Sequence, residues 1–323
     1  MVKIDLKDRR ILYQLDIDSR QSLTQVGKKV GLKKDVVSYR IKRLIDEGLI
    51  KNFFTVIDAY KLGYIVFRFY LEFQYVTPDI RNKIIEHFVN YKNTWVVFSI
   101  KGTYDMGLVL WVKDIHDFHS FWDKTLDRYG DYFAQKTFSI YIQAFSYRPS
   151  YLLLDEYKKS DRLDYEIVGM GKKVDIDQFD YQILNEIAVD ARTPLIELAE
   201  KLNCSSQTVN YRLKHLTKSG VIQAFRTGID ISKLGLQHFK VDIYLKEHTQ
   251  RKNIMSYIKN NPYLMFISTS AGVSDLELEF HVENSDKLNL ILEEISSKFP
   301  EAIRNYDYFT VQQYYKVRLM PEL

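Results

Sequence analysis

The stretch YRIKRLIDEGLI at residues 39–50 returns 172 residues later as YRLKHLTKSGVI at residues 211–222. Aligned on this stretch, residues 4–63 and 176–235 match without a gap and are identical at 23 of 60 positions. A weaker likeness continues at an offset of 170, which places Gly102 on Gly272. Self-similarity at a fixed period predicts that the chain consists of two tandem copies of one unit.

The repeated stretch is the end of a pattern of three short helices. Apolar spacing predicts a first helix over residues 5–17, and Ser22 with Gln25 gives the capping-box pattern of a second. A third helix is predicted over residues 33–47, and the apolar run 49–54 behind it predicts a strand hairpin. Three short helices followed by a hairpin are typical of a winged helix-turn-helix, whose third helix enters the major groove.

The outward side chains of the third helices are the candidate DNA-binding residues, because cations release counterions from phosphates and polar groups read base edges. In the first copy these residues are Lys33, Lys34, Ser38, Tyr39, Arg40, Lys42 and Arg43. In the second copy they are Ser205, Ser206, Gln207, Thr208, Asn210, Tyr211, Arg212 and Lys214. A solvated basic face is the simpler reading of one such helix, but the repeated three-helix order favours DNA binding.

The two copies differ in charge. Residues 3–52 hold 13 Lys/Arg and 7 Asp/Glu, which gives +6, whereas residues 175–224 hold 5 and 7, which gives −2. We therefore expect the first winged helix to lead DNA binding, and Arg40→Ala to cost more DNA affinity than Arg212→Ala. The alternative is that the protein is a scaffold whose winged helices are degenerate and no longer contact DNA.

Each winged helix is followed by the element order βαββαβ, which is the ferredoxin-like arrangement. The predicted strands of the first copy are 64–75, 95–100, 106–112 and 138–147, and its helices are 78–90 and 114–129. The second copy repeats them as strands 237–245, 264–271, 276–282 and 303–318 and helices 251–260 and 285–298. The open sheet face is rich in Tyr and Phe, so we expect it to pack on another sheet, of the same chain or of a second one.

The fold class is therefore α+β, with two repeats of a winged helix-turn-helix and a ferredoxin-like domain. The expected divisions are a winged helix at 1–58, an α/β sandwich at 62–148, a linker at 149–172, a second winged helix at 173–230 and a second sandwich at 234–320.

Composition is that of a globular protein with buried cores, since 46% of the 323 residues are hydrophobic. The only cysteine is Cys204, no apolar run reaches the ~20 residues of a membrane helix, and the N-terminus lacks a signal-peptide pattern, so we expect a cytoplasmic protein. No motif for a cofactor is found. His116, His119 and Asp123 share a helix face that could hold a metal, but such pairs are more often surface residues.

The order of these motifs resembles the Lrp/AsnC (feast/famine) family of transcription regulators. The residues that carry the likeness are Asp5 and Asp8, Leu-x-x-Val-Gly at 23–27, Tyr-Arg-Ile-Lys-Arg-Leu at 39–44, Gly-Leu-Ile-Lys at 48–51, Ile-Asp at 57–58, Leu-Gly at 62–63 and Gly-Thr-Tyr-Asp at 102–105. The likeness covers nearly the whole chain, twice. It implies pairing of the α/β domains, binding of pseudo-palindromic double-stranded DNA, and an amino acid or similar effector near the interface between sheets.

Most members carry one unit per chain, so the tandem chain departs from the family pattern and is expected to form an intramolecular pseudo-dimer or a homodimer through its sheets. The candidate effector-binding residues are Gly102, Tyr104, Asp105, Gly272 and Asp275. Gly and Asp are also what any tight β-turn favours, and Ser274 replaces the tyrosine in the second copy.

One enzyme class also resembles this architecture. Siroheme decarboxylases share the fold, some as fusions of two units, and are expected to carry Arg and His near the stretch that joins the modules. That stretch is FFTVID at residues 53–58 and FRTGID at residues 225–230, with no His in either and Arg226 only in the second. The regulator is therefore favoured over the enzyme.

Overall fold

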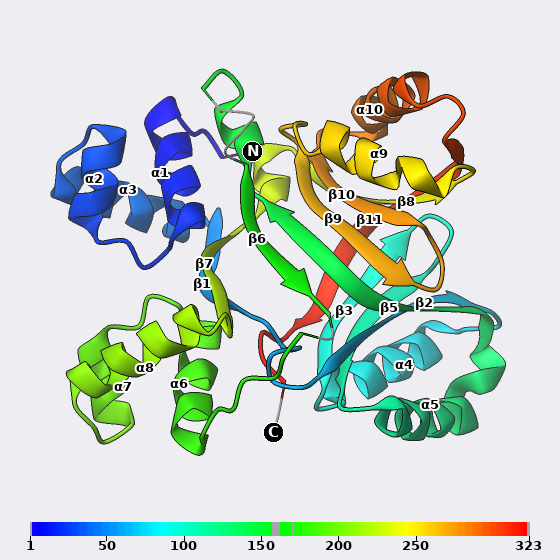
Figure 1. The fold of residues 1–323 in the computed structure, drawn as a ribbon, viewed down its shortest axis with the longest axis horizontal. Helices are drawn as coiled ribbons and strands as arrows, with labels where there is room; N and C mark the ends of the chain where they lie inside the picture. Colours follow the sequence, from blue (N-terminus) through cyan, green and yellow to red (C-terminus); the bar gives the residue numbers. More distant parts are fainter. Residues whose placement is uncertain (1, 157–161, 170, 322–323) are drawn as a thin grey trace.

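The computed structural model describes residues 2–156, 162–169 and 171–321. Each copy begins with three helices and a strand, and the two sets lie side by side on one side of the molecule (Figure 1). The first set is α1 (Leu6–Ile17), α2 (Leu23–Val30), α3 (Lys34–Asp46) and β1 (Ile50–Ile57). The second set is α6 (Gln178–Val189), α7 (Leu195–Lys201), α8 (Ser206–Lys218) and β7 (Ile222–Ile229).

Local sequence determines where these helices begin. Asp5 and Asp177 are the N-caps of α1 and α6, each in a capping box with the aspartate three residues later. Ser22 forms the predicted capping box with Gln25 at the start of α2. Gly31 follows α2 in the left-handed conformation, at φ 69°, which glycine adopts without steric cost.

The strand that follows the third helix of each copy does not form the predicted hairpin with a neighbouring strand of its own copy. β1 and β7 pair with each other, antiparallel, in a register that sets Phe53 opposite Thr227. Each copy thus contributes one strand to a ribbon shared by both winged helices. The local hairpin was a wrong prediction, because an apolar run shows that a strand forms but not which backbone edge it meets.

The α/β domains follow the predicted order. The first is β2 (Ile65–Phe73), α4 (Pro78–Asn90), β3 (Thr94–Lys101), β4 (Met106–Val112), α5 (Ile115–Tyr129) and β5 (Phe133–Tyr147). The second is β8 (Gln237–Leu245), α9 (Arg251–Ile258), β9 (Leu264–Ala271), β10 (Leu276–Val282), α10 (Ser285–Lys298) and β11 (Ile303–Val317). Alternate residues of each strand pack under the helices of their own domain.

Two long strands join the two sheets into one closed ring. β5 pairs with β2 over residues 133–140 and then with β9 over residues 140–146. β11 pairs with β8 over residues 303–310 and then with β3 over residues 310–317. Pairing between sheets, which the sequence left open to one chain or two, therefore occurs within one chain.

The faces that meet inside the ring are unlike. The first copy supplies apolar and aromatic side chains such as Tyr70, Phe98 and Trp111, together with the cation of Arg68. The second copy supplies ionisable groups, which are His238, Lys240, Asp242, Glu277, Glu279 and His281. The expectation of a Tyr- and Phe-rich open face therefore holds for the first copy only. Strands that alternate apolar and charged residues usually have one face exposed to solvent. Here the charged face is buried against the other copy.

A bidentate ion pair crosses between these faces. Arg68 of β2 donates through both terminal nitrogens to Glu277 of β10, and all but about 1% of each side chain is buried. Lys240 donates to the same carboxylate at 2.8 Å. Two cations hold the pKa of Glu277 well below its ordinary value, although burial alone would raise it.

The segment expected to be a linker, 149–172, contributes to the fold where it is described. A 3₁₀ helix covers Ser150–Leu153, and β6 (Leu163–Val168) pairs with the last part of β5. Between them, the buried Arg162 donates to the carbonyls of Lys259 and Leu264, each at 2.7 Å. In the described part of the chain, the helices are too short or too polar to cross a bilayer.

Candidate nucleic-acid interface

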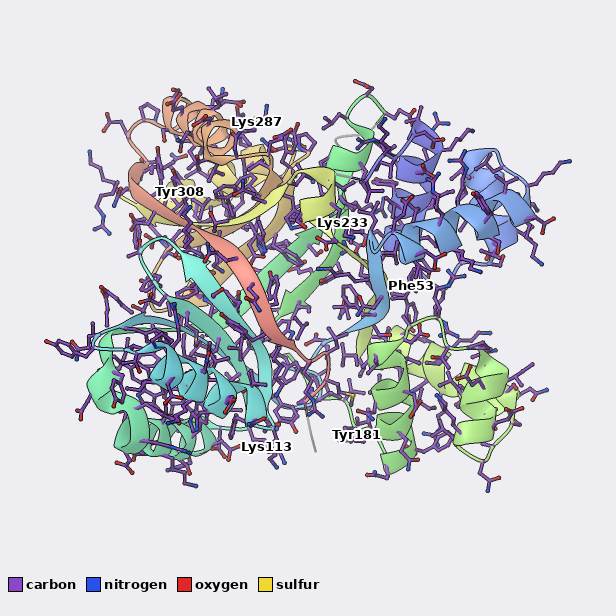
Figure 2. All side chains as sticks on the ribbon, turned by 180° about the vertical axis from the view of Figure 1, so that it is seen from behind. Phe53, Lys113, Tyr181, Lys233, Lys287 and Tyr308 are labelled. Carbon is purple, nitrogen blue, oxygen red and sulfur yellow. The ribbon has the colours of Figure 1, made fainter. Side chains whose placement is uncertain are left out.

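Reciprocal contacts clamp the two winged helices together. The backbone N–H of Ser19 donates to the carbonyl of Phe225 at 2.8 Å, and the N–H of Ala191 donates to the carbonyl of Phe53 at 2.9 Å. These four residues are related by the repeat, so the contacts obey a pseudo-two-fold axis through the β1–β7 ribbon. Figure 2, which labels Phe53 on β1, shows this ribbon between the two domains from behind.

A pair of arginines completes the clamp. Arg20 donates from Nη1 to the carbonyl of Ala191, and Arg192 donates from Nη1 to the carbonyl of Ser19. Each guanidinium also lies over a phenylalanine ring of the opposite copy. These rings are Phe225 and Phe53, whose centroids lie 5.6 and 5.2 Å from the guanidinium carbons. The sequence shows both arginines as identities of the repeat, but only the structure gives them this role.

The recognition helices α3 and α8 leave most of their predicted DNA-facing residues in solvent. On α3 the exposed side chains are Lys33, Lys34, Ser38, Tyr39 and Lys42. On α8 they include Gln207, Thr208, Tyr211 and Lys214, while Ser206 and Asn210 are half-buried. The tyrosines at equivalent positions, Tyr39 and Tyr211, are 69% and 68% exposed. An exposed tyrosine hydroxyl with lysine amines nearby suits contact with phosphates.

The predicted site arginines have an additional structural role. Arg40 donates from Nη1 to Asp5 and Asp8 at 2.8 Å, and Arg43 donates to Asp8 at 2.5 Å. These ion pairs tie α3 to the N-terminus of α1. Burial opposes ionisation of Asp5, but hydrogen bonds from the Asp8 amide and from Arg40 hold its pKa below the ordinary value.

The second copy repeats this arrangement. Arg212 donates from Nη1 to Asp177 at 2.7 Å and to Asp180 at 3.2 Å. Arg40 and Arg212 therefore have equivalent carboxylate partners, and the greater cost of Arg40→Ala for DNA affinity stays a prediction.

The first turn of α8 is arranged differently from that of α3. The Ser205 hydroxyl is the N-cap of α8: it accepts from the Thr208 amide at 3.1 Å and lies 2.9 Å from the Thr208 hydroxyl. Lys33 occupies the N-cap position of α3 and makes no side-chain cap. Ser205 and Thr208 are therefore partly occupied by capping, whereas the side chain of Lys33 is exposed and makes no cap.

The glycines of the predicted effector turns pack against the opposite copy. A Cβ on Gly102 would lie 2.8 Å from the Cβ of Phe309, and one on Gly272 would lie 2.5 Å from the carbonyl oxygen of Phe138. Both have positive φ, 151° and 143°. Close approach of the paired sheets therefore accounts for glycine at these two positions.

The other effector candidates also contact the protein itself. Asp105 accepts from the Phe73 amide at 2.8 Å, and Asp275 accepts from the Leu245 amide at 2.7 Å. The ring of Tyr104 stacks on a neighbouring aromatic ring at 5.1 Å. An effector site at these turns stays a prediction.

Arg226, the one arginine expected near a siroheme site, is a buried structural group. Its Nε donates to Asp16 at 2.9 Å, and its Nη1 donates to Asp164 at 2.8 Å and to Ser146 at 3.0 Å. Burial would lower its pKa, but the two carboxylates raise it above the ordinary value. This cation joins α1, β7, β6 and β5, and its donors are already occupied.

The helix face with two histidines is a surface feature. His119 lies 3.2 Å from Asp123, and both are well exposed. Across the residues that the structure describes, no three His, Cys, Asp or Glu side chains are grouped to hold a metal ion.

Comparisons with known proteins match these features. A family model described as winged helix-turn-helix DNA-binding matches residues 4–51 and again 176–223. The HTH-type transcriptional regulator FL11 of Pyrococcus abyssi is 30% identical over 122 residues, which are 38% of this chain and 80% of that protein. The proline dehydrogenase transcriptional activator of Rhizobium radiobacter is 34% identical over 121 residues, which are 36% and 74%.

A solved structure matches the tandem architecture as a whole. The siroheme decarboxylase NirDL superposes over 98% of this chain and 94% of its own, with a TM-score of 0.65 and 14% sequence identity. At this identity the match shows a common fold. The same two-copy architecture therefore exists in an enzyme, and chemistry has to be judged from the side chains.

Proposed function

Because the chain belongs to the Lrp/AsnC family of winged helix-turn-helix transcription regulators, we propose that it regulates transcription by binding specific double-stranded DNA as a covalent pseudo-dimer. The observation that carries this proposal is the pair of exposed recognition helices, α3 and α8, held by the reciprocal contacts of Arg20 and Arg192. One chain thus presents two reading helices in a fixed relation, as a dimer does for two half-sites.

The direct test is a mobility-shift assay of the full-length chain against genomic fragments, with competitor DNA and a series of salt concentrations. Specific binding should persist over competitor, and the affinity should fall steeply with salt because lysines replace counterions at phosphates. Equal binding to all fragments at every salt concentration would contradict the proposal.

We propose further that the chain is not a siroheme decarboxylase. Support comes from Arg226, whose guanidinium is buried and engaged by Asp16 and Asp164 and so is not available to a tetrapyrrole carboxylate. The test is absorbance spectroscopy of the purified protein after incubation with siroheme. Unchanged siroheme with no retained absorbance after gel filtration is expected, whereas retained pigment with decarboxylated product would establish the enzyme.

An effector that is an amino acid or a similar small molecule is the remaining part of the proposal, and family membership supports it. Thermal shift assays with each of the twenty amino acids test it, because a ligand that binds only the folded chain raises its melting temperature. No shift with any of them at millimolar concentration would count against such an effector.

A further inference from the structure

The two recognition helices are alike in the middle and different at the start. Aligned by the repeat, α3 and α8 have the same exposed tyrosine and the same exposed lysine, Tyr39 with Lys42 and Tyr211 with Lys214. The first turns share no residue at the five outward positions. In α3 these are Lys33, Lys34, Asp35, Val36 and Ser38, and in α8 they are Ser205, Ser206, Gln207, Thr208 and Asn210.

The first turn of a recognition helix is the part that reaches base edges in helix-turn-helix proteins. Lys33 and Lys34 offer two exposed amines, which suit guanine O6 and N7 and the phosphates beside them. Gln207 and Asn210 offer side-chain amides, which pair bidentately with adenine N6 and N7. The chemistry of the two first turns therefore favours different bases, while the shared tyrosine and lysine give both helices a common backbone contact.

The clamp fixes these unlike helices in one assembly. Arg20 and Arg192 bind across the pseudo-two-fold axis, and the β1–β7 ribbon continues between the two domains (Figure 1). A homodimer offers the same reading helix twice and so selects an inverted repeat of one half-site. A covalent pair of different helices is free of that restriction.

We propose that this protein recognises a directional DNA site made of two unlike half-sites, with α3 on a guanine-containing half and α8 on an adenine-containing half. The proposal rests on the proposed function and specifies the DNA that it requires. The site has one orientation, so the protein binds with its first copy always on the same side.

Selection of duplexes from a random pool with the full-length chain tests the proposal. The recovered motif should hold two different half-sites at constant spacing and order. The protein should bind this site at least about tenfold more tightly than an inverted repeat of either half, since each mismatched base pair costs about tenfold or more. An inverted repeat of one half-site, or protection of a single half-site, would overturn it. No enrichment of any duplex would instead overturn the proposed function.

Two variants with exchanged first turns provide the matched test. One carries Ser205→Lys, Ser206→Lys, Gln207→Asp, Thr208→Val and Asn210→Ser, and the other carries the reciprocal five changes in α3. Each variant should select an inverted repeat of the half-site whose helix it now has twice. The α3 start folds without a side-chain cap, so the first variant copies an arrangement that this chain already tolerates. Retention of the wild-type motif by both variants would overturn the proposal.

The single cysteine reports the orientation directly. Cys204 directly precedes α8 and is half-buried. Because it lies in the second copy, an iron chelate attached to its thiol should cleave the DNA beside that copy. Cleavage should fall in the adenine-containing half alone. The matched control carries Leu32→Cys with Cys204→Ser, which moves the chelate to the equivalent place before α3 and should move cleavage to the other half. Equal cleavage of both halves by either protein would overturn a fixed orientation.

Discussion

Arg226 distinguishes the two copies at the residue scale. It occupies the position that Phe54 holds in the first copy, and its partner Asp16 occupies the position that Ala188 holds in the second. The ion pair of Arg226 and Asp16 thus joins the two copies, and the equivalent positions across the pseudo-two-fold axis hold the apolar residues Phe54 and Ala188. Burying an ion costs several kcal/mol, which only well-placed partners repay, so the geometry of Asp16 and Asp164 around this guanidinium decides the stability of that junction.

Replacing this cation should destabilise the fold. We expect Arg226→Phe to lower the free energy of unfolding by about 3–5 kcal/mol, because the buried carboxylates of Asp16 and Asp164 lose the cation that they share. Adding Asp16→Ala, which reproduces the Phe54 and Ala188 combination of the equivalent positions, should recover part of the loss. Urea unfolding of the three proteins measures both effects. A near-neutral Arg226→Phe would show that the ion pair is not required.

His281 should make the protein sensitive to mild acid. Burial, with repulsion from His238, lowers the pKa of His281 to about 3. Between that value and the ordinary ~6.5 the unfolded imidazole binds a proton that the folded one does not, so stability is lost as pH falls below 6.5. The stability advantage of wild type over His281→Gln should shrink by about 2 kcal/mol from pH 7 to pH 5. Unfolding curves at both pH values measure it, with the exposed His116→Gln as control.

Lys33 and Lys34 should supply the salt-dependent part of DNA binding. Each phosphate contact contributes about 0.9 to the slope of log affinity against log salt. Replacing both lysines by alanine should therefore reduce the magnitude of that slope by nearly two, whereas Ser205→Ala with Ser206→Ala at the equivalent positions should leave it unchanged. Titrations at several salt concentrations measure the slopes. Equal effects of the two double variants would contradict a leading role for the first copy.

Three strand pairings join the two copies. β1 pairs with β7, and β5 and β11 each leave their own sheet to pair with a strand of the other copy. The β1–β7 ribbon holds the winged helices together, because each of them contributes one of its strands. Arg20 and Arg192 also join the two winged helices, beside this ribbon. The ribbon and the two arginines together position α3 relative to α8.

Loosening the clamp should weaken binding to two half-sites together more than binding to one. We expect Arg20→Ala with Arg192→Ala to leave the affinity for a single half-site nearly unchanged and to lower the affinity for the complete site by about tenfold or more, because the second contact loses its preset geometry. Titration of both duplexes measures this, and hydrogen exchange of the β1–β7 amides reports the loosening. Equal losses on both duplexes would indicate general unfolding instead.

The whole molecule is a closed ring of strands in which each copy completes the other. The largely aromatic face of the first copy and the ionisable face of the second bury each other, and the ion pair of Arg68 and Glu277 joins them. A copy alone would expose either an aromatic surface or a row of charges together with unpaired strand edges.

Each copy should therefore need the other in order to fold and stay soluble. We expect residues 1–172 and 173–323, expressed alone, to aggregate or stay partly unfolded, and to form a soluble 1:1 complex when expressed together. Size-exclusion chromatography and co-purification measure this. Arg68→Ala in the first fragment should weaken the complex, because it leaves Glu277 with one countercharge fewer. Two fragments that fold separately and do not associate would contradict this dependence.

The sequence alone determined the duplication, the element order and the helix caps. These depend on local chemistry: the capping box of Ser22, the spacing of apolar residues and the alternation within strands act over a few residues, so they can be predicted along the chain. The family likeness and the outward residues of α3 and α8 follow from the same local patterns.

Only the tertiary structure decided which edges and faces meet. The partner of β1, the burial of the charged face around Glu277, and the carboxylates that hold Arg40, Arg212 and Arg226 all depend on residues distant in the sequence. A strand pattern is the same whether its neighbour is local or belongs to the other copy, and a charged residue looks the same whether it faces water or an ion pair. Pairing over such separations is set by the packing of the whole ring, which no local pattern contains.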